Sequence, residues 1–161
     1  MSQSLKFDLV VVLGHSHCGS TLLGRMLNRH PDVICPGEFL WLDDALDKNL
    51  PCSCGQPLPD CPFWSRHLPQ IRPEILRQYR KTRIEDLHAL RQAEHRSLLL
   101  DLSKSRFYRV SRLERAERLG LIFLVRDPRA LLASRLREGG ELPHEIRKLR
   151  KWSGRFLKLV G

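Results

Sequence analysis

The sequence has no apolar run long enough to cross a membrane. Its apolar runs, such as Leu9 to Leu13, are far shorter than the roughly 20 residues that a spanning helix needs. The polar start, MSQSLKFD, also lacks the charged and then apolar layout of a signal peptide. We therefore expect a cytoplasmic protein without a membrane span.

Aromatic residues are scarce at 7%, and no nucleic-acid-binding motif or aromatic platform is present, so nucleic acid is not an expected partner. Acidic residues are scarce in the second part of the chain. Residues 1–71 carry 5 basic and 7 acidic side chains, whereas residues 72–161 carry 23 basic and 11 acidic ones. The resulting net charge of +10 attracts anionic ligands without specifying which. The length of 161 residues, with 42% hydrophobic and 29% charged residues, predicts a single globular domain over 1–161.

The chain lacks an even number of cysteines: it has five, which cannot all pair, and in a reducing compartment this argues against a disulfide framework. The five are Cys18, Cys35, Cys52, Cys54 and Cys61. The last three lie in a Cys- and Pro-rich loop insertion over 50–65, and with His67 they could form a Cys₃His zinc site. The Cys-x-Cys gap is tighter than the usual two to four residues. We therefore expect no metal site, and favour free thiols packed around Phe63 and Trp64.

Three apolar runs have the length and composition of buried strands: Phe7 to Leu13, Leu98 to Leu100 ending at Asp101, and Leu121 to Val125. Helical patterns follow them. One helix is expected from Ser20 to the HPD stop at residues 30–32, and others over about 73–94 and 143–160. This alternation predicts an α/β domain with a three-layer, P-loop-like fold, in which a central parallel β-sheet is flanked by helices.

The stretch GHSHCGST, residues 14–21, has the glycine spacing of a loop that holds a phosphate. Backbone N–H groups and the dipole of the following helix favour an oxyanion there. A nucleotide triphosphatase would place lysine where this chain has Ser20, and that lysine acts with Mg²⁺ on a highly charged phosphate. Because a sulfuryl group carries less negative charge, a loop without lysine suits it better. A plain strand-to-helix turn is the alternative interpretation.

A second stretch, LIFLVRDPRALLASRL, ends a strand at Arg126 and begins a helix in which Asp127 is the N-cap and Pro128 the first residue. Arg126 should therefore project at the carboxyl edge of the sheet, where open α/β folds bind ligands. Ser134 lies on the helix face that can assist an anion contact. A structural ion pair with Asp127 is the alternative role for Arg126. The expected packing residues of the helix are Leu131, Leu132 and Leu136.

Together, GHSHCGSTLLGRMLNRHPDVICPGE and FLVRDPRALLAS resemble the sulfotransferases that use 3′-phosphoadenosine 5′-phosphosulfate (PAPS). The first segment is similar to their 5′-phosphosulfate loop. The second is similar to their 3′-phosphate motif, an Arg with a Ser eight residues on, as Arg126 and Ser134 are here. The resemblance extends from about Phe7 to Arg137. It implies PAPS as donor, adenosine 3′,5′-bisphosphate (PAP) as product, a hydroxyl or amine acceptor, and no required metal.

The resemblance also implies roles for individual residues. The donor loop would consist of Ser16, His17, Cys18, Gly19, Ser20 and Thr21. His17 stands where the family usually has Arg or Lys, the residue that steadies the bridging oxygen as the sulfuryl group leaves. Because histidine is only partly charged near neutral pH, a slower or more pH-dependent reaction is expected.

Two further residues are implied on the acceptor side. Glu38, in CPGE, matches a glutamate that takes the acceptor proton in several relatives, a role that requires hydrogen-bond reach to the acceptor hydroxyl. Lys104, in DLSKS, matches a Ser-Lys segment of the acceptor pocket and is a candidate for the sulfuryl oxygens. Taken alone, each would more often be an exposed charge.

Family members usually continue well past the 3′-phosphate motif, so the domain is expected to be incomplete at its C-terminus. A homo-oligomer or a partner chain could complete it. Two rival functions stay open. A P-loop nucleotide kinase or triphosphatase would use Asp101 in SLLLD as a Walker-B-like acid. A non-catalytic protein that binds PAPS or PAP would keep the nucleotide site without turnover.

Overall fold

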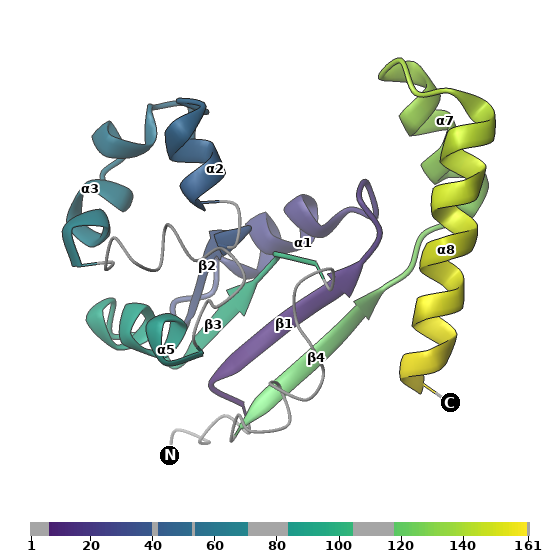
Figure 1. Cartoon of the computed structure of the whole chain (residues 1–161). Helices are drawn as coiled ribbons and strands as arrows, with labels where there is room; N and C mark the ends of the chain where they lie inside the picture. Colours follow the sequence, from purple (N-terminus) through teal and green to yellow (C-terminus); the bar gives the residue numbers. More distant parts are fainter. Residues whose placement is uncertain (1–6, 40–41, 53, 71–83, 105–117, 161) are drawn as a thin grey trace.

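The computed structural model describes residues 7–39, 42–52, 54–70, 84–104 and 118–160. Its centre is a four-stranded sheet in the order β2-β3-β1-β4 (Figure 1). The strands are β1 (Leu9–Gly14), β2 (Val33–Gly37), β3 (Leu98–Asp101) and β4 (Leu119–Leu124). All three neighbouring pairs are parallel. The α/β fold with a parallel sheet is therefore confirmed.

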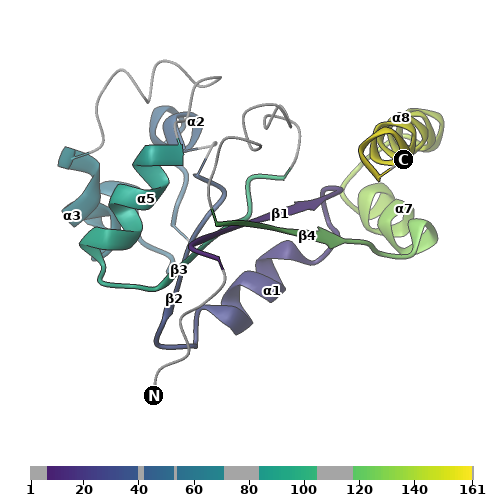
Figure 2. The ribbon, with the colours of Figure 1, turned by 90° about the horizontal axis from the view of Figure 1, so that it is seen from below.

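Helices cover both faces of the sheet. Alternate residues of β1 point to opposite sides, and both sets are apolar, so each face needs a layer of helices to bury it. Val10 and Val12 pack with Leu100 on the side of α1 (Ser20–Leu27). Leu9 and Val11 belong to the core on the other side, which α2 (Leu42–Asp47), α3 (Trp64–His67) and α5 (Ile84–Ala93) cover (Figure 2). Two short 3₁₀ turns, Leu58–Asp60 and Leu68–Gln70, flank α3. The central strand is thus buried on both faces, as its β-branched run predicts.

Two helices follow the last strand, α7 (Pro128–Arg137) and α8 (Leu142–Val160), and they pack side by side beyond β4 (Figure 1). Glu145 of α8 is buried, 3.4 Å from the Nε atom of Arg135 and 2.9 Å from Lys148. The hydrogen bond from Lys148, together with the charge of Arg135, holds the pKa of the Glu145 carboxyl below its usual value despite burial. The two helices therefore form one unit, here called the α7–α8 hairpin. No helix in the described residues is long and apolar enough to span a membrane.

Strand β2 was not expected from the sequence. Its composition, VICPG, contains a proline and a glycine that usually end strands. Proline is tolerated here because β2 lies at the edge of the sheet. The helix expected up to residue 30 ends earlier, at Leu27, because the chain must turn back into β2. The side-chain oxygen of Asn28 accepts a hydrogen bond from the Cys35 backbone N–H at 2.8 Å across that turn.

Two helix predictions need adjustment. The helix expected over 73–94 is seen from Ile84 to Ala93, and the earlier part of that range falls outside the described residues. In α7, Leu131 is buried as expected, whereas Leu136 is 40% exposed and does not pack the helix down. The prediction for Leu136 was wrong because α7 lies beyond the edge strand, where less of the sheet is available to cover it.

Candidate functional site

The glycine loop follows β1 and leads directly into α1. A Cβ atom on Gly14 would lie 2.8 Å from the Cys18 Sγ and 2.9 Å from the Leu124 carbonyl oxygen, so only glycine fits between the loop and β4. The loop closes with a hydrogen bond from the Cys18 N–H to the His15 carbonyl at 3.2 Å. Gly19 is the N-cap of α1 and has a φ of 101°, a conformation that favours glycine. Both glycines therefore shape the loop.

Backbone donors gather at the start of α1. The N–H of Leu23 donates to the Gly19 carbonyl at 3.0 Å, so the N–H groups of Ser20, Thr21 and Leu22 precede the first N–H that donates within the helix. The Ser20 side chain is buried and that of Thr21 is exposed. A helix start with free N–H groups and a positive dipole end is suited to an anion. The loop can hold one oxyanion through its main chain.

His17 adopts a left-handed conformation with a φ of 67°, which is uncommon for a residue with a Cβ atom. Its Nδ1 atom lies 3.3 Å from an oxygen of Glu138, which follows α7. No sequence spacing points to Glu138, because it is distant in the chain and belongs to no motif. The imidazole is thus held by an acid from the α7–α8 hairpin, on the loop where the anion would bind.

His15 lies on the same loop but is buried. Burial lowers the pKa of its imidazole, and the nearby charge of Arg135 acts in the same direction, against the hydrogen bond between Nδ1 and the Ser16 carbonyl at 2.9 Å. A histidine of this kind stays neutral in the folded chain near neutral pH. His15 therefore contributes to loop structure rather than to the positive charge at the site.

Arg126 connects the two sequence motifs in space. Its Nη1 atom donates a hydrogen bond of 2.8 Å to the carbonyl oxygen of His17. Asp127, the alternative partner, instead caps α7 by accepting from the Arg129 N–H and forms an ion pair of 2.7 Å with the Arg129 guanidinium. These bonds hold the pKa of the Asp127 carboxyl below its usual value. Ser134 is half-buried on α7, two turns after Arg126. The guanidinium and the amide donors of the glycine loop thus lie at one rim of the sheet.

Glu38 and Lys104 lie next to each other although they are distant in sequence. Glu38 follows β2, Lys104 follows β3, and the lysine ammonium forms a hydrogen-bonded ion pair with the Glu38 carboxylate. The Glu38 side chain is 33% exposed and the Lys104 side chain is 18% exposed. Lys104 has a φ of 55°, so this candidate, like His17, adopts a left-handed backbone conformation. Because β2 and β3 are neighbours in a parallel sheet, both residues emerge at the same carboxyl edge as the glycine loop.

Asp101, the acid expected of a triphosphatase, has a structural contact instead. Its side chain is fully buried, and one carboxylate oxygen accepts from the Ser103 N–H at 3.0 Å and from the Ser103 hydroxyl at 2.5 Å. These bonds hold the turn that carries the chain from β3 to Lys104. The arrangement is that of a local turn cap, not of an acid aimed at an exposed metal ion.

The comparisons with known proteins identify a family. The model of the sulfotransferase family matches residues 9–159. No curated protein and no solved structure matched the chain. The matched range includes both motifs, all four strands and the ion pair of Glu38 and Lys104. The chain therefore belongs to the sulfotransferase family.

Proposed function

We propose that this chain transfers a sulfuryl group from PAPS to a hydroxyl or amine acceptor. The observation that carries the proposal is the hydrogen bond from Arg126 to the His17 carbonyl. It brings a guanidinium to a loop of main-chain donors, so that the two groups can bind two phosphates of one nucleotide. Membership of the sulfotransferase family supports this interpretation.

In the donor complex, the 5′-phosphosulfate would lie against the N–H groups of residues 19–22 and the hydroxyls of Ser16, Ser20 and Thr21. The guanidinium of Arg126 would leave the His17 carbonyl and bind the 3′-phosphate, with the Ser134 hydroxyl beside it. Charge-assisted hydrogen bonds of this kind are stronger than neutral ones. Both halves of the donor site are supplied without a metal ion.

In the transfer step, the acceptor oxygen or nitrogen forms a bond to sulfur while the bond from sulfur to the bridging oxygen breaks. Glu38 takes the acceptor proton, and PAP leaves with the bridging oxygen. Lys104, which pairs with Glu38 in the free protein, stabilises the sulfuryl oxygens. His17, when protonated, donates to the bridging oxygen. Each group acts where charge develops, which is where electrostatic stabilisation has most effect.

A calorimetric titration tests the donor site. We expect PAP to bind at least about tenfold more tightly than ADP, because only PAP presents a 3′-phosphate to Arg126. Removing Mg²⁺ with a chelator should leave PAP binding unchanged. Tighter binding of ADP, or binding that needs Mg²⁺, would instead support a kinase or triphosphatase. Binding of PAP without sulfate transfer to any of a panel of hydroxyl and amine acceptors would indicate a non-catalytic protein.

The choice of histidine at position 17 leads to a prediction for two substitutions. A cationic donor at this position helps the leaving group, so His17→Lys should transfer the sulfuryl group at least as fast as the wild type. His17→Ala removes the donor and should be slower by about 10²-fold or more. The measurement is the single-turnover rate of the three proteins at one pH. Equal rates for His17→Ala and the wild type would remove His17 from the proposed mechanism.

A further inference from the structure

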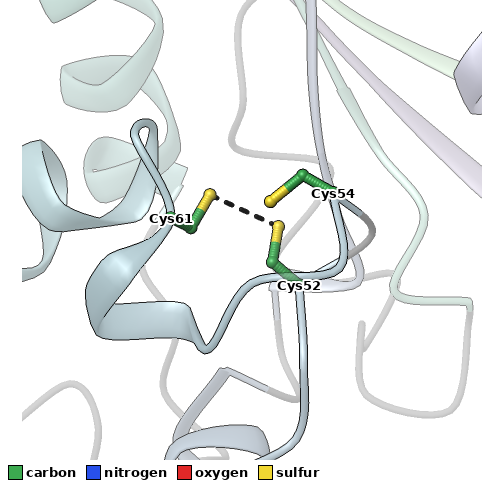
Figure 3. A group of neighbouring side chains, drawn as sticks. All are labelled: Cys52, Cys54 and Cys61. Atoms are coloured by element: carbon green, nitrogen blue, oxygen red, sulfur yellow. Dashed lines mark hydrogen bonds between the residues drawn. The ribbon is translucent and has the colours of Figure 1, made fainter.

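Three cysteines gather on the loop that precedes α3. The sulfur atoms of Cys52, Cys54 and Cys61 all lie within 4.8 Å of one another, and a hydrogen bond of 3.4 Å joins the sulfurs of Cys52 and Cys61 (Figure 3). Figure 3 shows the three thiols directed toward one another from two separate stretches of backbone. None of the three forms a disulfide bond. The proposed sulfate transfer uses none of them.

The backbone explains how so short a Cys-x-Cys spacing converges. The N–H of Gly55 bonds to the Cys52 carbonyl at 2.8 Å, and Gly55 has a φ of 90°, so the chain reverses directly after Cys54. The N–H of Cys52 then bonds to the Gln56 carbonyl at 2.8 Å. This tight turn brings the Cys54 sulfur back over Cys52. Cys61 approaches from the other side, anchored by its N–H on the Pro57 carbonyl at 2.9 Å.

The spacing of the sulfurs is that of ligands around one ion. A zinc–sulfur bond of about 2.3 Å places two sulfurs of a tetrahedral site about 3.8 Å apart. The observed contacts, from 3.4 Å up to the 4.8 Å limit, bracket this value. A small movement of each side chain would therefore complete three bonds to a central ion.

We propose that Cys52, Cys54 and Cys61 bind a zinc ion as three thiolates, with the fourth position open to water or to an added ligand. His67, which the sequence offered as a fourth ligand, is not in the group of converging side chains, and its Nε2 atom is 2.6 Å from an oxygen of Glu94. The described residues place no further ligand side chain in the group. Thiolates match the preference of zinc for sulfur donors.

The ion would fasten the loop to the core. Cys61 is 3% exposed and belongs to the same core cluster as Leu58, in the turn before α3, and Trp64, the first residue of α3. Cys52 packs against that cluster from the other end of the loop. Zinc between Cys52 and Cys61 would therefore stabilise the packing of the loop and of α3 against the core. This role is independent of the proposed sulfate transfer.

Metal content tests the proposal directly. The full-length chain is purified under reducing conditions with added zinc, passed through a desalting column, and measured by plasma mass spectrometry. We expect about one zinc ion per chain in the wild type, and less than about a tenth of that in Cys54→Ser. Cys54 is exposed, so its substitution spares the core. The matched control is Cys35→Ser, a half-buried thiol outside the cluster, which should keep the full zinc content.

Two further measurements separate a bound ion from a merely structural cluster. Co²⁺ in place of zinc should give the intense thiolate charge-transfer absorption in the wild type and lose it in Cys54→Ser. A strong chelator should lower the Tm of the wild type and leave that of Cys54→Ser unchanged. The proposal is overturned if the reduced wild type retains no zinc, if Cys54→Ser retains as much as the wild type, or if the cluster is isolated as a Cys52–Cys61 disulfide that cannot be loaded.

Discussion

Replacing Arg126 with alanine is expected to weaken PAP binding by roughly 30- to 100-fold. The guanidinium lies within hydrogen-bond distance of the glycine loop, where it can turn from the His17 carbonyl to a 3′-phosphate. A hydrogen bond to a charged group contributes about 1.5–3 kcal/mol, and the loss of two such bonds, moderated by solvent at this exposed site, gives a factor of this size. The measurement is a calorimetric titration with PAP.

Arg129→Ala is the matched control for Arg126→Ala. Arg129 lies three residues further along the same motif, carries the same charge, and pairs with Asp127. Because the Asp127 cap uses the backbone N–H of Arg129, the cap survives this substitution. We expect Arg129→Ala to bind PAP within about threefold of wild type, as a screened surface charge should. Equal losses in the two variants would mean that net charge, and not a specific clamp, attracts the nucleotide.

Replacing Glu38 with glutamine should lower kcat by about 10²- to 10⁴-fold, which is the usual contribution of a positioned general base. Glutamine keeps the size of the side chain and cannot accept the proton. PAP binding should stay unchanged, since Glu38 lies on the acceptor side and contacts Lys104. The measurement is the initial rate of sulfate transfer from PAPS at saturating donor, beside a PAP titration of the same sample.

Glu141→Gln serves as the control for Glu38→Gln, because Glu141 is exposed and lies between α7 and α8, away from the ion pair with Lys104. Its kcat should match the wild type. Lys104→Met adds a second check: it leaves the base in place and removes the cation, so kcat should fall while the proton acceptor remains. A Glu38→Gln variant with wild-type kcat would rule out Glu38 as the base.

The fold was predictable because its signals are local. A β-branched run such as Leu9 to Leu13, followed by glycines and an amphipathic helix, has few alternatives to a buried parallel strand. The Asp127-Pro128 start of α7 was equally clear, since both residues have strong preferences at a helix N-terminus. Strand β2 was missed because its proline and glycine are tolerated only at an edge, and the edge position depends on the whole sheet.

The contacts within the site were less predictable, since they join residues far apart in the chain. The sequence indicated Glu38 and Lys104 separately, and their ion pair appears only when β2 lies beside β3. No pattern in the sequence indicated that Glu138 lies beside His17. The closeness of the three cysteine sulfurs was also not predictable from the Cys-x-Cys spacing, because it depends on the turn at Gly55 that reverses the chain.

Residues 125–127 link the end of β4 to the start of the α7–α8 hairpin, and Arg126 lies in the middle of that link. A tilt of the hairpin therefore acts as a lever on the guanidinium. A nucleotide bound by both the glycine loop and Arg126 would restrict the movement of the hairpin relative to the sheet. By reciprocity, a ligand that favours the nucleotide-bound orientation of the hairpin must tighten nucleotide binding by the same factor by which the nucleotide tightens the binding of that ligand.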